Sequence, residues 1–169
     1  MVQAGQKKLP SWLHLESIKL DRYELKAGRN LTTFEFLSEG TKSQIIKLVQ
    51  FQQMNLSNLY NLAFGDLNQL TGQFDDKLVT DNGNSEKVLA TVIASIYAFA
   101  GQYTDAWIYA TGSTATRTRL YRMGINKYYE IVEGDFDIMG EYLSEREWYK
   151  KGRDYQAFAV HLKTSKFEP

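Results

Sequence analysis

The segment between residues 112 and 124 holds the side chains best suited to bind a charged ligand. Glycine and two hydroxyl residues follow an apolar run there, and hydroxyls of this kind cap the first turn of a helix. The N–H groups of a helix N-terminus bind phosphate or carboxylate groups. The predicted ligand-binding residues are Gly112, Ser113, Thr114, Arg117, Arg119 and Arg122. Arg117 is the strongest candidate because it stands nearest to the helix start.

The same residues also fit a purely structural role. Ser113 or Thr114 is then an ordinary helix cap, and the arginines form a solvated face or pair with nearby acids. Four basic and no acidic residues lie between Ser113 and Tyr129, whereas residues 130–141 carry five acids. We weigh the structural role slightly ahead of the anion site.

Other catalytic or metal-binding constellations find little support. The chain has no cysteine, which excludes thiolate nucleophiles and cysteine-ligated metals. Its only histidines are His14 and His161. An acidic group in residues 66–81 lacks the alternating oxygen ligands and terminal glutamate of a calcium loop. We therefore expect no metal site.

The composition limits the class of protein. Of the 169 residues, 43% are apolar and 14% aromatic, enough to fill a core, so wholesale disorder is excluded. Twenty basic and twenty acidic residues cancel, which argues against binding to a long nucleic acid or an anionic membrane. No apolar run reaches the length of a membrane span and no signal peptide is recognised. We expect a soluble cytoplasmic protein.

Alternation of apolar and polar residues predicts most of the strands. Residues 32–38 form one strand, and residues 43–54 admit a strand or a short helix but favour a hairpin with it. A further apolar run covers 59–67, and a central strand covers 106–111, apolar on both faces. Two more strands are predicted over 136–142 and 155–162, joined by a connection over 148–153.

Two helices complete the expected fold. The first begins at a cap on Asn84 or Ser85, and Gly101 is its expected C-cap. The second runs from Ala115 to about Met123 and ends at Gly124. Residues 66–84 are a long loop, and residues 1–20 an N-terminal arm before one domain over 21–169. This order predicts an α+β fold with an antiparallel-rich mixed sheet, in which residues 103–111 lie parallel to the strand before the first helix.

Most of the chain resembles a family of small bacterial proteins of unknown function that is common in Bacteroidetes. The matching stretches are FEFLSEGTKSQI (34–45), YNLAFGD (60–66), DNGNSEKVLATV (81–92), AWIYATGSTATRTRLYRMGI (106–125) and YQAFAVHLK (155–163). The resemblance implies no particular activity.

The order of strands and helices is also similar to that of GNAT-type N-acyltransferases. Leu120, Tyr121, Gly124 and Ile125 look like the LYxxxGF segment of that family. This likeness implies acetyl-coenzyme A as cofactor and Tyr121 as the general acid that protonates the departing thiolate. The loop before the first helix, residues 82–87, departs from the family's glycine-rich pyrophosphate loop because it has one glycine and an acid at the helix start.

Aromatic residues crowd the C-terminal third and suggest further partners. They include Tyr121, Tyr128, Tyr129, Tyr142, Trp148, Tyr149 and Tyr155. Packing in the sheet is the first interpretation, a protein-binding surface the second and stacking on nucleic acid the third. We therefore expect a binding module for a protein partner or a small anionic ligand, without a cofactor. The sequence leaves both catalysis and self-association open.

Overall fold

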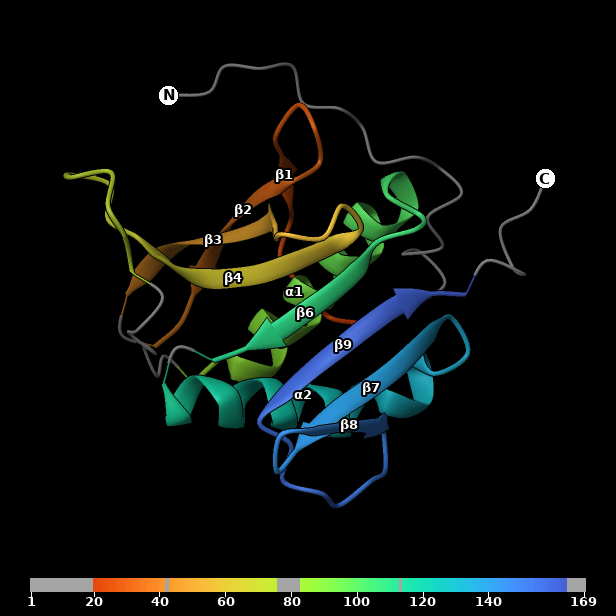
Figure 1. Cartoon of the computed structure of the whole chain (residues 1–169). Coiled ribbons are helices and arrows are strands. Elements are labelled where there is room, and N and C mark those ends of the chain that lie inside the picture. Colours follow the sequence, from red (N-terminus) through yellow and green to blue (C-terminus); the bar gives the residue numbers. More distant parts are fainter. Residues whose placement is uncertain (1–19, 42, 76–82, 113, 164–169) are drawn as a thin grey trace. The chain divides into compact units, whose positions relative to one another are not determined.

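A computed structural model describes residues 20–41, 43–75, 83–112 and 114–163. Within these residues the chain forms nine strands and two helices, an α+β fold with a mixed, mostly antiparallel sheet (Figure 1). The hydrogen-bonded strand order is β1-β2-β3-β4-β6-β9-β7-β8, and β5 pairs with β4. This confirms the predicted fold class. The expected arm over 1–20 lies almost wholly outside the described residues.

The chain divides into two compact units. Unit 1 comprises Met1–Phe51 and Ala63–Gln102, and unit 2 comprises Gln52–Leu62 and Tyr103–Pro169. Strand β4 contributes its first half to unit 2 and its second half to unit 1. The two units are described separately below.

Unit 1 is a group of antiparallel strands packed on one helix. Its strands are β1 (Lys26–Ala27), β2 (Thr33–Glu39), β3 (Gln44–Gln53), β4 (Leu59–Leu67) and β5 (Phe74–Asp75). The predicted hairpin is confirmed, because β2 pairs antiparallel with β3 and Phe34 faces Val49. Residues 66–84 were expected to be a loop, but their described part contains β5.

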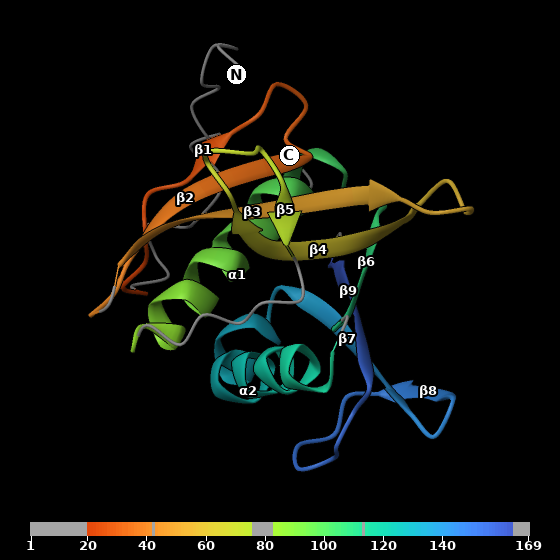
Figure 2. The same ribbon diagram turned by 90° about the vertical axis from the view of Figure 1, so that its left-hand side faces the viewer.

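Helix α1 (Ser85–Gln102) lies along one face of these strands (Figure 2). Its buried residues occur on nearly every side, as its apolar sequence predicts. Aromatic rings join helix and sheet: Phe99 stacks on Phe51 with 4.2 Å between ring centres. Gly101 was expected to end the helix, but it is buried inside the last turn, and Gln102 is the last helical residue.

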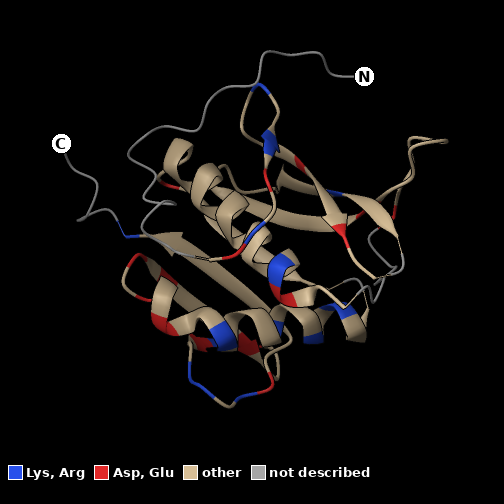
Figure 3. Ribbon diagram, turned by 180° about the vertical axis from the view of Figure 1, so that it is seen from behind, with Lys and Arg blue, Asp and Glu red and all other residues tan. Residues whose placement is uncertain are grey.

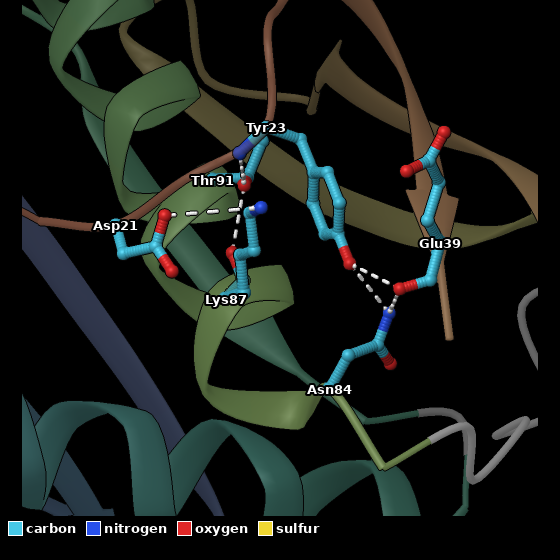
Figure 4. Close-up of polar contacts among 6 residues, drawn as sticks. All are labelled: Asp21, Tyr23, Glu39, Asn84, Lys87 and Thr91. Carbon is cyan, nitrogen blue, oxygen red and sulfur yellow. Dashed lines mark hydrogen bonds and ion pairs between the residues drawn. The ribbon is translucent and has the colours of Figure 1, made fainter. Parts of the chain in front are cut away.

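The segment before β1 is fastened to the start of α1 by a polar network (Figure 4). The Tyr23 backbone N–H donates to Thr91 Oγ1 at 2.9 Å. Asn84 Nδ2 donates to the Tyr23 hydroxyl and to Ser38 Oγ, both at 2.8 Å. Lys87 Nζ lies 4.4 Å from the centre of the Tyr23 ring. The predicted cap residue Asn84 therefore holds neighbouring segments as well as the helix start.

Unit 2 contains the remaining strands and helix α2. Its elements are β6 (Trp107–Thr111), α2 (Ala115–Val132), β7 (Phe136–Tyr142), β8 (Glu145–Trp148) and β9 (Ala157–Leu162). Strand β6 lies parallel to the first half of β4 and antiparallel to β9, so the predicted central, parallel position of residues 106–111 is confirmed. Figure 1 shows α2 behind β9 and β7.

Two elements of unit 2 differ from the sequence-based expectation. Helix α2 continues nine residues beyond the predicted end at Met123, up to Val132, with Gly124 buried inside it. An interior glycine costs a helix about 1 kcal/mol relative to alanine, and the packing of Tyr121, Tyr128 and Val132 outweighs that cost. Residues 145–148 form strand β8 against β7, although Trp148 was assigned to a connection.

Strands β7 and β8 are joined by a two-residue turn. Leu143 and Ser144 form it, with φ of 51° and 66°. This left-handed conformation at both positions is typical of the tight turns that suit the twist of a hairpin. Leu143 is 70% exposed. The hairpin is thus closed by residues that carry a side chain in a conformation favouring glycine or asparagine.

The interior of unit 2 is built around Tyr155, which is fully buried. Its ring lies against Gly140 of β7, where an added Cβ would come within 2.4 Å of Tyr155 Cδ1. The Tyr155 hydroxyl donates to Glu147 Oε1 and accepts from the Lys150 backbone N–H, both at 2.8 Å. Tyr155 therefore ties β7, β8 and the following loop together.

Neither of the two described helices combines the length and apolar character needed to cross a membrane.

We expect Gly140→Ala to lower the free energy of unfolding by about 3 kcal/mol, because the new methyl group displaces a buried ring. Urea unfolding followed by circular dichroism measures this change. Gly28→Ala is the matched control, since its Cβ would stand 3.4 Å from the nearest atom, the Thr33 carbonyl oxygen. Equal stability of the two variants would contradict the tight contact between Gly140 and Tyr155.

We expect Asn84→Ala and Tyr23→Phe each to lower the free energy of unfolding by about 1 kcal/mol, and the double variant by less than the sum. The reason is that both substitutions remove the same hydrogen bond between Nδ2 and the hydroxyl. A double-mutant cycle in urea measures the coupling. Strict additivity would show that the two groups do not interact.

Candidate functional site

The predicted strand-to-helix turn is present, and the chain packs closely within it. Strand β6 ends at Thr111, and Thr114 caps α2 by accepting the Arg117 N–H on its Oγ1 at 3.2 Å. Gly112 lies so close to the helix that an added Cβ would stand 2.2 Å from the Thr118 backbone nitrogen. Gly112 is therefore required sterically. Ser113 lies outside the described residues.

The three arginines predicted to bind an anion have different environments. Arg117 was the strongest candidate because it stands nearest to the helix start, but its side chain is only 2% exposed and does not face solvent. Arg122 donates to the Tyr155 carbonyl oxygen from Nη2 at 3.0 Å and from Nε at 3.3 Å, and forms an ion pair with Asp154 at 3.5 Å. Arg119 is exposed. The geometry gives Arg117 and Arg122 structural positions, and an anion at this helix start remains a prediction.

The charges of α2 run against its dipole (Figure 3). Basic residues lie in its N-terminal and middle turns, its first turn has no acid, and its last turn has no base. A helix dipole favours the opposite order. The predicted local polarity is therefore present along the helix.

Tyr121, the general acid implied by the acyltransferase likeness, is 7% exposed. A general acid must reach its substrate within hydrogen-bonding distance. Tyr121 belongs to the buried face of α2 with Tyr128 and Val132, which explains its place in the sequence by packing.

The acidic residues form no metal site in the part of the chain that is described: no group of three His, Asp or Glu side chains lies within coordinating reach. Asp76 and Asp81, which belong to the acidic stretch over residues 66–81, lie outside the described residues. His161 stacks on Trp107 with 4.9 Å between ring centres, and its Nδ1 lies 4.0 Å from Asp137 Oδ2. These contacts give His161 a structural position on β9.

Unit 1 buries one charged pair that the sequence analysis did not single out. Lys47 of β3 donates to Asp66 Oδ1 of β4, and the two side chains are 7% and 14% exposed. Lys47 Nζ also lies 5.9 Å from the centre of the Phe64 ring. The signal in the sequence was a single lysine inside the apolar strand QIIKLVQF. Because its ammonium group is engaged by a carboxylate, packing and charge pairing explain this lysine without a reaction.

The aromatic residues of the C-terminal third separate into core and surface. Tyr121, Tyr128, Tyr149 and Tyr155 are buried, so they serve packing, although they lie on α2 or in the loop after β8 and not on strands of the sheet. Burial, together with the hydrogen bond to Glu147, raises the pKa of Tyr155 above its usual value. Tyr129 and Tyr142 are half-buried, and Trp148 is the most exposed of the seven, at 61%. Trp148 was noted in the sequence as one aromatic among many, and only its place on β8 distinguishes it.

Trp148 stands on the face of the unit 2 sheet opposite α2. It pairs with Met139 of β7, whose neighbours Ile138 and Gly140 are buried on the α2 side. Trp107 and Tyr109 of β6 point to the same side, because they alternate with the buried Ile108. Helix α2 lies behind this face of unit 2, which is turned toward the viewer in Figure 1. Burial and the nearby Glu141 carboxylate raise the pKa of Tyr109.

We expect Asp66→Leu to lower the free energy of unfolding by about 3 kcal/mol, because it leaves a buried ammonium group without its counter-charge. Adding Lys47→Met should recover most of that loss, since no buried charge then remains. Urea unfolding of the two single variants and the double variant measures this. A double variant less stable than either single variant would show that the pair contributes net stability.

A model described as "Family of unknown function (DUF6934)" matches residues 19–163. No curated protein matches the chain, and no solved structure does. The comparisons therefore give no support to the acyltransferase likeness, and they do not bear on a bacterial source. The matched range contains every described residue, and therefore all of the described strands and helices. The chain belongs to the DUF6934 family, a family of unknown function.

Proposed function

We propose that this protein works by binding another protein chain along β8, the outer strand of unit 2. The observation that carries the proposal is the 61% exposure of Trp148 on a strand at the end of the sheet order. Tryptophan and arginine dominate the binding energy of many protein interfaces. We call residues 145–148, with their outward backbone groups, the β8 edge.

The backbone of the β8 edge supports strand addition. The Tyr149 N–H donates to the Ile138 carbonyl oxygen on β7 at 2.9 Å. Because backbone groups alternate along an antiparallel strand, those of Glu145 and Glu147 also point toward β7. The N–H and C=O groups of Arg146 and Trp148 then point away from the sheet. No other described strand pairs with this side of β8.

The side chains of the β8 edge are unusual for an exposed sheet margin. Proteins usually protect such margins with short strands and charged residues, and Glu145, Arg146 and Glu147 fit that pattern. A largely exposed tryptophan does not fit it, because it adds apolar surface where unwanted pairing starts. A partner that covers Trp148 accounts for its presence.

The charges favour a protein over a nucleic acid as the partner. The β7–β8 hairpin carries Asp137, Glu141, Glu145 and Glu147 against one arginine, Arg146. A phosphate backbone would meet these carboxylates with like charge. This agrees with the neutral net charge of the whole chain.

The experiment is a quantitative comparison of proteins captured from the source cells by the wild-type chain and by Trp148→Ala. We expect at least one protein to be enriched by the wild type and lost with the variant. That protein, once purified, should bind the variant about tenfold more weakly, as expected for an interface tryptophan. Isothermal titration calorimetry measures both dissociation constants.

Leu70→Ala is the matched control, because Leu70 is 97% exposed and belongs to unit 1. It should leave the interaction unchanged. The contradicting outcome is that Trp148→Ala changes neither the binding of any captured protein nor the self-association of the purified chain. The β8 edge is then not the docking surface.

A further inference from the structure

We infer that the chain that pairs with the β8 edge is a second copy of this protein, joined antiparallel about a twofold axis at Glu147. This inference rests on the proposed function and names its partner. In closed symmetric dimers the same surface of both copies meets itself, so the surface must be self-complementary. The β8 edge can be tested for this property residue by residue.

Backbone hydrogen bonding allows few registers. Residues whose N–H and C=O groups point outward must face residues of the same kind on the other strand. With Glu147 on the axis, Arg146 of each copy faces Trp148 of the other, and all outward groups of both residues form hydrogen bonds. An axis between Arg146 and Glu147 would place outward groups opposite inward ones and leave them unpaired.

The two neighbouring registers are less favourable. An axis at Trp148 would place Arg146 opposite Lys150, whose N–H already donates to the Tyr155 hydroxyl at 2.8 Å. An axis at Arg146 would place Trp148 opposite Ser144, which has φ of 66° and belongs to the turn. Only the twofold axis at Glu147 pairs two extended residues, Arg146 and Trp148, and among the described residues no backbone group hydrogen-bonds to their outward groups.

The side chains of this register are complementary on the face opposite α2. Each Arg146 guanidinium would lie directly across from the indole of the other copy's Trp148, where a cation is attracted to the ring face. The present ion pair of Arg146 with Glu141 is long, at 3.9 Å, and the arginine side chain is 63% exposed. Arg146 can therefore turn toward a new neighbour at little cost.

The other face of the register is balanced in charge. The two Glu147 side chains would meet at the axis, which alone is unfavourable. Each Glu147 is accompanied by cations of its own copy, Arg153 at 3.1 Å and Lys150 at 3.8 Å. Glu145 of one copy would also lie near Lys150 of the other, since the acidic start of β8 faces the basic residues that follow it. Attraction between the two ends then offsets the repulsion at the axis.

Disulfide formation tests the register directly, because the chain has no cysteine of its own. In the proposed register the two residues at 147 form a non-hydrogen-bonded pair with Cα atoms about 4.5 Å apart. A disulfide needs a Cα separation below about 7 Å. Glu147→Cys should therefore give a disulfide-linked dimer under mild oxidation, seen on a non-reducing gel and lost on reduction.

Glu145→Cys is the matched control on the same strand. Its two copies would be offset by four residues, about 13 Å along the strands, too far to form a disulfide. We expect the Glu145→Cys protein to remain uncrosslinked under the same conditions. Equal crosslinking at both positions, or stronger crosslinking at 145, would overturn the register.

Glu147→Cys also removes the hydrogen bond that Glu147 accepts from the Tyr155 hydroxyl. Sedimentation equilibrium of variants that keep Glu147 therefore provides an independent measurement of dimerisation. The wild-type chain should dimerise, Trp148→Ala and Arg146→Glu should each weaken dimerisation about tenfold, and Leu70→Ala should not. A wild-type chain that is monomeric at about 0.2 mM, with no crosslink at 147, overturns the self-pairing. The proposed function then stands only if the wild-type chain captures a different protein and Trp148→Ala abolishes that capture. If no such protein is captured, the proposed function fails together with the self-pairing.

Discussion

The contact between Tyr155 and Gly140 is the constraint on which unit 2 depends. The aromatic ring occupies the space that any side chain at position 140 would fill. Its hydroxyl reaches Glu147 and the Lys150 N–H, and its carbonyl oxygen accepts two hydrogen bonds from Arg122. One buried residue therefore connects α2, β7, β8 and the loop before β9. The position of β8, and with it the exposed tryptophan, follows from this connection.

The same contact gives part of the basic stretch of sequence a structural role. Arg122 is directed to the Tyr155 carbonyl oxygen, and Arg117 is buried at the start of the same helix. Gly112 allows the end of β6 to lie directly against the helix start. Gly112, Thr114 and Arg117 at the helix start therefore all take part in the packing or capping of unit 2.

Sequence patterns predicted the elements whose periodicity is strong and left out those whose role depends on distant partners. The paired strands at 33–39 and 44–53 and the apolar helix after Asn84 follow from alternation and capping. Strand β8 was missed because Glu145, Arg146 and Glu147 look like a solvated connection, and only pairing with β7 makes them a strand. The end of α2 was misplaced because a glycine inside a helix is tolerated only when surrounding residues pack against it.

For the candidate site, the sequence located the turn, the cap and the glycine, but it could not show the direction of a side chain. Burial of Arg117 depends on how α2 lies on the sheet, and this information is not local. The exposure of Trp148 also depends on the topology of the sheet. The sequence contains eleven tyrosines and three tryptophans, but their number does not show which of them lies at the surface.

The left-handed turn at Leu143 and Ser144 has a consequence for specificity. Because the loop has only two residues, the pairing of β8 with β7 cannot shift by one residue unless the turn changes its conformation. A slip of that size would exchange the two sides of β8, turning the indole inward and a carboxylate outward. The two-residue turn therefore fixes the register of β8 on β7 and keeps the Trp148 side chain on the exposed face of the sheet.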